Sequence, residues 1–478
     1  MKLRSKLYEG PGSHGALRAT VGTRGLRSVL RALPSEMYFQ AFFTSLDRSG
    51  ETPPVTLSPL VENREGSYTP GDPGRDLARV VARYPDTETI VLVRSDTALL
   101  RGEELPDVSL PENPETGRPV NLVVCEDASP GMGEIAGLDQ AVEGIVRAHA
   151  RPLEKSQEPT VNLFGPPALN PRAAAEYEEA ERLLGLLGVG VNARVPLGGS
   201  VRELSRISRA WANLVLYREA GESATLYLQD EFEMPRVTTP MIGAAGTGAV
   251  LRAIGDLCGL DAGRVQRVIW GELGQTSKLP WFARLVTPEI LRGRRAAIFG
   301  DLTYTLGLGY ALAREVGIEV AWAGAYLEHL ERDFLFNANS FTDGAFFTDD
   351  PAEVAARVEE DEPDLLIGTH LEREVAEALD IPFLPLCPPT ATQPFVESPL
   401  VGYAGSSNLA DALGDILRRS AQKPEAPSRS LPWTEDALEE LDEVPAFLRG
   451  RARRLAEDHA KEEGAREITR EVFERSRI

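Results

Sequence analysis

An isolated carboxylate, Glu36, is the first residue in the sequence whose type and setting suggest chemistry. It interrupts the apolar stretch "ALPSEMYF" (32–39), between Ser35 and Met37. A carboxylate buried without a partner costs several kcal/mol, so Glu36 needs either a partner or access to water. Glu36 is then either an acid of a turn or helix start that reaches solvent, or a ligand or proton-handling group. The residues alone favour the turn or helix start, because helix N-termini favour acids.

Two further segments place polar residues where a predicted strand ends. In "IFGDLTYTLGLGYAL" (298–312) Asp301 follows a strand, and in "LIGTHLERE" (366–374) His370 and Glu372 do the same. Ligands of open α/β sheets collect at the carboxyl ends of the strands. Asp301 therefore lines a ligand site or ties its loop to the next helix start, and both interpretations stay open. A single histidine at such a position is more often a structural residue than a catalyst.

The sequence contains no motif for a self-contained metal, disulfide or nucleotide site. Cys125, Cys258 and Cys387 lie far apart in apolar segments, which is typical of small core residues in a reducing compartment. The five histidines form neither a zinc pair nor a hydrolase triad. The glycine-rich run "IGAAGTGAVLRAIG" (242–255) has neither G-x-G-x-x-G nor a phosphate loop with its lysine, so we expect a tight turn into a helix there.

The elements that must position these residues are short apolar strands that alternate with helices, the pattern of parallel α/β sheets. Several strands are apolar on both faces, as strands covered by helices on each side are. The clearest helix is predicted from a cap at Asn170, through Pro171, to Gly188. The predicted strands are residues 89–93, 120–126, 160–165, 190–198, 212–217, 295–301, 319–324, 364–370 and 382–387.

The length of 478 residues exceeds the size at which one core usually divides, so about three domains are expected. Proline-rich or strongly polar joints supply the boundaries. We predict a first α/β domain that carries Glu36 (1–155), a second Rossmann-like domain (156–285), a third Rossmann-like domain (286–420), a linker (421–432) and a C-terminal helical module (433–478).

The composition restricts the classes of partner and the location. The formal net charge of −22 argues against a nucleic-acid surface, which needs clustered Lys and Arg. No segment offers the roughly 18 apolar residues of a transmembrane helix, and the N-terminus lacks the apolar core of a signal peptide. We expect a cytoplasmic protein that binds neither nucleic acid nor a membrane.

The C-terminal segment resembles a known family. "LPWTEDALEELDEVPAFLRGRARRLAEDHAKEEGAREITREVF" (431–473) is similar to the C-terminal helical module of the B subunit of light-independent (dark-operative) protochlorophyllide reductases. The stretches "YEGPGSHGALR", "VNLFGPPALNPR", "AIFGDLTYTLGLG" and "LIGTHLERE" match that subunit in the same order, so the resemblance covers nearly the whole chain. The Z subunit of chlorophyllide a reductase has a similar tail, but "GDLTYTLGLG" and "GTHLERE" are nearer to the B subunit.

The resemblance implies a fold of the nitrogenase component 1 type, with three Rossmann-like parallel-sheet domains and a small C-terminal helical module. It implies a heterotetramer with an N-type subunit, reduced by a separate ATP-binding iron–sulfur homodimer, so that ATP is not bound by this chain. The complex of that family reduces a ring double bond of a tetrapyrrole, protochlorophyllide, to give chlorophyllide. A 4Fe-4S cluster lies between its two subunits, with three Cys ligands from the N-type subunit and one carboxylate from the B subunit.

Three positions of this sequence correspond to functional positions of that family. The carboxylate ligand, an Asp in the family, falls on Glu36, whose extra methylene shifts the oxygen by about one C–C bond length. The family's proton-donating Asp falls on Thr287, which cannot act as a carboxylic acid, and Glu289 substitutes for it only if the local backbone shifts. A family His falls near Ala391.

The leading prediction is therefore an oxidoreductase subunit of this reductase type. The alternative is a divergent homologue that acts on another tetrapyrrole, as chlorophyllide a reductase does, or a non-catalytic assembly partner.

Overall fold

The structure is a computed structural model of the whole chain. It describes residues 7–37, 55–62, 68–70, 72–101, 110–114, 116–125, 131–277, 288–291, 293–389, 398–422, 432–442, 444, 452, 455–456, 459–460, 463–465 and 467–476.

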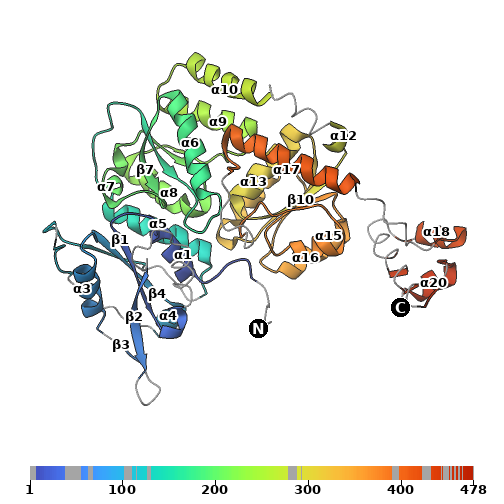
Figure 1. Cartoon of the computed structure of the whole chain (residues 1–478), viewed down its shortest axis with the longest axis horizontal. Helices are drawn as coiled ribbons and strands as arrows, with labels where there is room; N and C mark the ends of the chain where they lie inside the picture. The colour runs from blue at the N-terminus through green and yellow to red at the C-terminus, as the bar shows by residue number, and fades with distance from the viewer. Residues whose placement is uncertain are drawn as a thin grey trace.

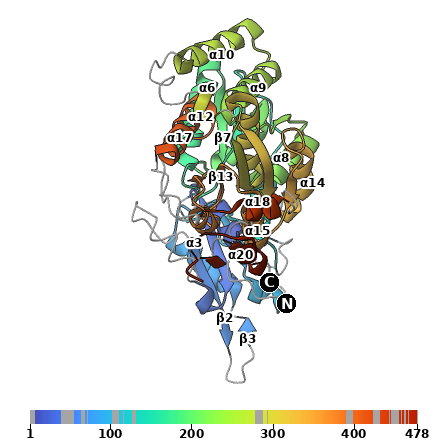
Figure 2. The same cartoon turned by 90° about the vertical axis from the view of Figure 1, so that its right-hand side faces the viewer.

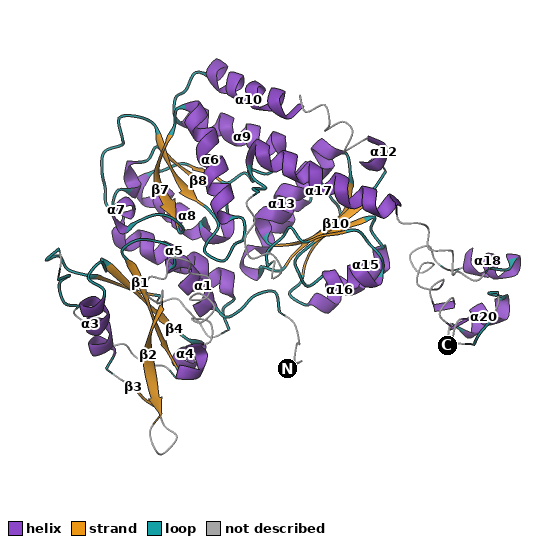
Figure 3. Cartoon of the chain, in the orientation of Figure 1, coloured by secondary structure: helices purple, strands orange, loops and turns teal. Residues whose placement is uncertain are grey.

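The strands of the described residues form three separate sheets (Figures 1 and 3). The first has the order β3-β2-β1-β4-β5, built from β1 Leu26–Ala32, β2 Val55–Glu62, β3 Tyr68–Pro70, β4 Thr89–Arg94 and β5 Asn121–Val124. The second has the order β7-β6-β8-β9, from β6 Thr160–Phe164, β7 Gly190–Val195, β8 Ala212–Val215 and β9 Arg236–Val237. The third has the order β12-β11-β10-β13-β14, from β10 Arg295–Gly300, β11 Glu319–Ala325, β12 Ala345–Phe347, β13 Leu365–Ile367 and β14 Phe383–Leu384.

All pairs among these described strands are parallel except β2 with β3. Parallel strands need helical crossovers, and the helices supply them. The helices of the first unit are α1 Gly12–Thr20, α3 Pro73–Arg83, α4 Asp96–Leu100 and α5 Glu134–His149. Those of the second are α6 Ala173–Leu187, α7 Val201–Leu204, α8 Glu222–Phe232, α9 Gly243–Leu257 and α10 Ala262–Ser277. Those of the third are α12 Pro288–Leu291, α13 Leu302–Ala311, α14 Glu331–Ala338, α15 Pro351–Asp361, α16 Arg373–Ala378 and α17 Gly402–Gln422.

The prediction of three parallel-sheet α/β domains is confirmed. One hydrophobic cluster runs through all three sheets and the helices between them, and a second covers the other face of the first sheet against α3. Figure 2 shows α10 and the β2–β3 pair at opposite ends of the molecule. The exact domain limits, including the boundaries at 155/156 and 285/286, stay a prediction, and α17 runs two residues past the predicted limit at 420, to Gln422.

Each of the nine strands predicted from the sequence coincides with a strand of the structure. The helix predicted from Asn170 is present, but its start was wrong. It begins at Ala173, and the Asn170 side chain instead accepts a hydrogen bond from the Arg172 N–H at 3.0 Å, just before the helix. Its predicted end is correct, because Gly188 stops the helix in the left-handed conformation with φ 77°.

The C-terminal segment has a small core of its own. The Trp433 ring packs against Phe473 at 5.6 Å, and residue 433 pairs with Ile468 in a parallel bridge. Its helices α18 Glu435–Asp442 and α20 Arg470–Arg475 lie apart from the three sheets in Figure 1. Within the described part of the chain, no helix has the length and apolarity needed to cross a bilayer.

Candidate functional site

Glu36 lies at the carboxyl edge of the first sheet. The neighbouring parallel strands β1 and β4 end at Ala32 and Arg94, so the residues that follow them meet at one edge. After β1 the chain makes a short 3₁₀ turn, Pro34–Met37, that carries Glu36. After β4, Ser95 caps the short helix α4 and Thr97 lies in its first turn. The strand pairing thus brings Glu36 beside residues about 60 positions later in the sequence.

The Glu36 carboxylate is held by three donors of its own chain. The Leu33 N–H donates to Oε2 at 2.6 Å, and the Ser95 hydroxyl donates to the same oxygen at 3.0 Å. The Thr97 hydroxyl donates to Oε1 at 2.7 Å. Hydrogen bonds to an ionised group are stronger than neutral ones, so these donors fix the direction of the carboxylate. The turn-acid interpretation therefore holds for the local geometry, since Glu36 folds back on the N–H three residues before it.

The same geometry leaves room for a ligand at Glu36. A carboxylate offers about four acceptor positions, and the described donors use three of them. Glu36 is only half-buried, so an outside group can reach the remaining position on Oε1. The donor set fits a carboxylate that supplies one bond to a metal cluster.

A 4Fe-4S cluster fits at Glu36 only if another chain supplies the other ligands. Among the described residues, no three His, Cys, Asp or Glu side chains come together to hold a metal ion. Cys258 and Cys387 are buried, as predicted. Cys125 follows β5 at the edge that carries Glu36, but burial raises the pKa of its thiol to about 12, which keeps it protonated.

The two other positions carried over by the resemblance cannot be related to Glu36. Thr287 and Ala391 lie outside the described residues. Glu289 lies in α12, Pro288–Leu291, and its side chain is not among those described. The roles of these residues stay predictions.

Asp301 and Glu372 prove to be structural ties within the fold. Asp301 is fully buried, caps α13 through the Tyr304 N–H at 3.1 Å, and accepts the Tyr217 hydroxyl at 2.8 Å. Glu372 accepts the Thr369 N–H at 2.7 Å and the Tyr8 hydroxyl at 2.6 Å. His370 contacts the Pro389 carbonyl through Nδ1 at 2.8 Å. The loop-to-helix interpretation of Asp301 is therefore the one that its contacts support.

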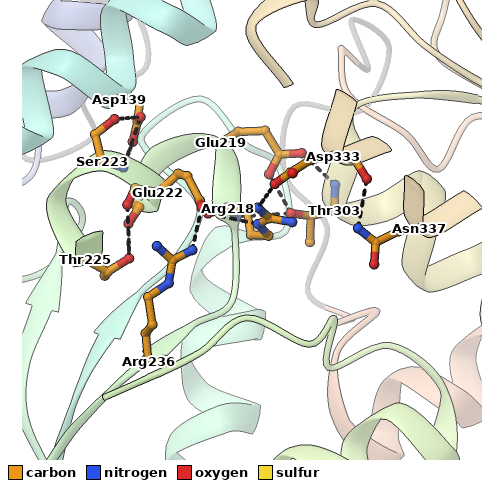
Figure 4. A network of polar contacts seen from close by, with 11 residues as sticks. Asp139, Arg218, Glu219, Glu222, Ser223, Thr225, Arg236, Thr303, Asp333 and Asn337 are labelled. Carbon is orange, nitrogen blue, oxygen red and sulfur yellow. Dashed lines mark hydrogen bonds and ion pairs between the residues drawn. The ribbon is translucent and has the colours of Figure 1, made fainter. Parts of the chain in front are cut away.

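Sequence reasoning missed a chain of polar contacts, most of them buried, that joins the three units (Figure 4). The Arg218 guanidinium binds Glu222 of α8 and Asp333 of α14, and Glu219 accepts the Thr303 N–H at 2.6 Å. Asp139 of α5 accepts hydrogen bonds from Ser223. Burial raises the pKa of Asp139 to about 7. The sequence signal was present, because the charged run "YREAGE" (217–222) begins two residues after the end of the apolar strand β8.

The glycine-rich run at 242–255 forms most of α9, and the N-terminus of this helix already holds an anion of the chain. The Glu315 carboxylate accepts the Ala244 N–H at 2.8 Å and the Ala245 N–H at 3.0 Å. These are donors that a phosphate would use at a helix start. The prediction of a turn into a helix is confirmed, with Gly243 in the left-handed conformation at φ 79°.

Comparison with known proteins agrees with this architecture. Residues 14–418 match the family described as "Nitrogenase component 1 type Oxidoreductase", and residues 433–477 match "Proto-chlorophyllide reductase 57 kD subunit". The chain is 30% identical to the B subunit of the light-independent protochlorophyllide reductase of Leptolyngbya boryana, over 99% of this chain and 98% of that one. It is 28% identical to the same subunit of Chlorokybus atmophyticus over the same shares.

A solved structure titled "Nitrogenase Cp1 at pH 6.5" superposes with a TM-score of 0.69 at 16% identity, covering 89% of this chain and 96% of that one. This likeness shows the fold. Together with the matches along the whole sequence, it shows that the chain belongs to the nitrogenase component 1 type oxidoreductases, and among them to the B subunits of light-independent protochlorophyllide reductases.

Proposed function

We propose that the chain is the B-type subunit of a complex that reduces a ring double bond of a tetrapyrrole, protochlorophyllide, to give chlorophyllide. The names of the relatives that match along 99% of the chain support the reaction. The observation that carries this chain's own part is Glu36, a fixed and half-buried carboxylate at the carboxyl edge of the first sheet.

In this proposal Glu36 holds one corner of a 4Fe-4S cluster, and three thiolates of an N-type partner subunit hold the others. When bound, such a cluster supplies electrons singly. This chain's contribution is to aim the carboxylate, since Ser95, Thr97 and the Leu33 N–H hold it in one orientation. ATP is hydrolysed by the separate iron–sulfur homodimer and is not bound by this chain.

Reduction of a carbon–carbon double bond also consumes a pair of protons. The family's donor position corresponds to Thr287, whose hydroxyl does not ionise near neutral pH. We therefore propose Glu289, two residues later, as the acid that donates in its place. Glu289→Gln in the assembled complex should lower turnover while leaving the iron content unchanged. Turnover equal to that of the unaltered complex would exclude Glu289 as the donor.

The test of Glu36 is the iron content of the purified complex with its partner subunit. Glu36→Ala should lose the electron paramagnetic resonance signal of the reduced cluster and most of its iron. Glu36→Asp, which restores the family's residue, should keep both. Glu231→Ala removes an exposed acid of α8 and is the control. An iron content of Glu36→Ala equal to that of Glu231→Ala would show that Glu36 is not a ligand.

Turnover separates the reductase from the alternative of a divergent or non-catalytic homologue. The complex, the iron–sulfur homodimer and ATP are mixed with protochlorophyllide, and its absorption is followed in the dark. Chlorophyllide formation is the expected result. A complex that assembles and holds its iron but forms no chlorophyllide would favour the alternative.

A further inference from the structure

A cavity of about 380 Å³ lies between the second and third units, and none of its lining residues belongs to the first. On one side it is lined by the loop after β9 and the first turns of α9. On the other it is lined by α13, the turn that follows α13, and the end of α14. Its size falls in the range of small-molecule sites, which are commonly found between domains.

The walls of the cavity combine an apolar surface with a few polar groups. Ile242, Ala249 and Leu306 supply apolar surface, and Tyr310 adds an aromatic ring. That ring is held in place, because it packs edge-on against Phe341 at 5.1 Å and its hydroxyl donates to the Asn337 carbonyl at 3.3 Å. A fixed ring beside aliphatic side chains suits a flat or aromatic ligand body.

Arg314 is the cation that the cavity offers to a ligand. Its guanidinium lies over the Tyr310 ring, 4.7 Å from the centroid, and within the described part of the chain it forms no ion pair with a carboxylate. The other arginine of the lining, Arg218, is already bound to Glu222 and Asp333. An anion that enters the cavity would therefore be held by Arg314.

The turn that carries Arg314 is unusual. Leu312–Val316 is a π-helical turn closed by a hydrogen bond from the Gly317 N–H to the Leu312 carbonyl at 2.9 Å. π-helical turns are rare and are frequent at functional sites. Here the consecutive residues Arg314 and Glu315 both line the cavity. The Glu315 carboxylate is engaged by the Ala244 and Ala245 N–H groups at the start of α9, so it is held there and not at Arg314.

We propose that this cavity binds a small organic anion whose carboxylate or phosphate group pairs with Arg314 and whose apolar body packs on Tyr310, Leu306 and Ile242. Because the walls come from two units, the bound anion ties the second unit to the third. The site is separate from Glu36, and its existence does not depend on the proposed reaction.

The test uses the full-length chain and four probes: 1-naphthyl phosphate, 1-naphthoate, inorganic phosphate and neutral 1-naphthalenemethanol. Binding of the naphthyl compounds is followed by their fluorescence, and that of phosphate by the shift of the unfolding midpoint. We expect both naphthyl anions to bind more tightly than phosphate or the alcohol. Whichever anion binds more tightly identifies the group as phosphate or carboxylate.

Arg314→Gln should lower the affinity for both naphthyl anions roughly tenfold or more, because a charge-assisted contact is lost. Arg332→Gln makes an equal change of charge at an exposed position of α14 and should leave the affinity for these anions unchanged. Ala249→Leu fills part of the cavity without changing its charge and should lower the affinity for the same two anions. Equal binding by Arg314→Gln and the unaltered chain would overturn the proposal, as would equal binding of the neutral alcohol.

Discussion

Among single residues, Glu36 shows how neutral donors can fix the direction of a half-buried carboxylate. Its three donors are an N–H and two hydroxyls, and all are neutral. These three donors form a cradle that fixes the carboxylate, and among the described residues it forms no ion pair. The remaining acceptor position on Oε1 is therefore open to a metal on the exposed side.

The hydrogen bond from Thr97 gives this cradle a measurable stability. Thr97→Val keeps the shape of the side chain but removes the donor to Glu36 Oε1 at 2.7 Å. We expect the free energy of unfolding to fall by about 1.5–3 kcal/mol, because hydrogen bonds to charged groups are worth this much. Urea unfolding measures the loss. Thr97→Ser retains the hydroxyl and is the control, so equal losses in the two variants would mean that the hydrogen bond contributes nothing.

The sequence predicted the candidate ligand but not its surroundings. Glu36 is a candidate because an acid interrupts an apolar stretch there, and the family resemblance implies that it is the carboxylate ligand of the cluster. Ser95 and Thr97 carry no such signal, since they lie 59 and 61 residues away in sequence. Only the parallel pairing of β1 with β4 brings them to Glu36. Contacts set by strand pairing cannot be read from local spacing.

Among the elements, helix α6 has an end that the sequence predicts from one residue, Gly188. Gly188 has φ 77°, a conformation that strains any residue with a side chain, whereas Gly185 lies within the helix with open space around it. Gly188→Ala should lower the free energy of unfolding by roughly 1–2 kcal/mol. Gly185→Ala should raise it by roughly 0.5–1 kcal/mol. Thermal or urea unfolding of the pair checks both signs, and a shared sign would contradict the helix end at Gly188.

The strands that escaped prediction carry polar residues or are very short. Strand β1 has the sequence "LRSVLRA", in which two arginines break the apolar pattern that would predict a buried strand. Arg31 is nonetheless fully buried, because its guanidinium donates to the Ser58 hydroxyl at 3.0 Å and to the Pro59 carbonyl at 2.8 Å. Strands β9 and β12 have two and three residues, too few for any periodic pattern. Apolar periodicity finds strands only where burial needs no polar partner.

For the whole molecule, polar contacts between the units show how the three units keep a fixed arrangement. Asp139 joins the first unit to α8 of the second, and Arg218 joins the second to Asp333 of the third. Tyr8, near the N-terminus, donates to Glu372 of the third unit at 2.6 Å. A buried polar group that loses its partner is costly, so these contacts select one arrangement of the units.

The link through Asp139 predicts how this arrangement responds to pH. Asp139 is 5% exposed, and burial raises its pKa to about 7 in the folded chain, against about 3.9 in an unfolded chain. Between these values the folded chain holds a proton that the unfolded chain has lost, so the free energy of unfolding falls as pH rises from about 4 to 7. Asp139→Asn cannot lose this proton. Relative to the unaltered chain, the variant should gain on the order of 1–4 kcal/mol over this range and then level off.

Urea unfolding of both proteins at several pH values measures this difference, in which other buried acids such as Glu176 cancel because both proteins contain them. Asp230→Asn, at an exposed position of α8, should show no such trend. If the difference for Asp139→Asn stays constant with pH, the carboxylate is charged at its contact with Ser223. The first and second units would then be joined by an ionised cap on α8, and their contact would not weaken as pH rises.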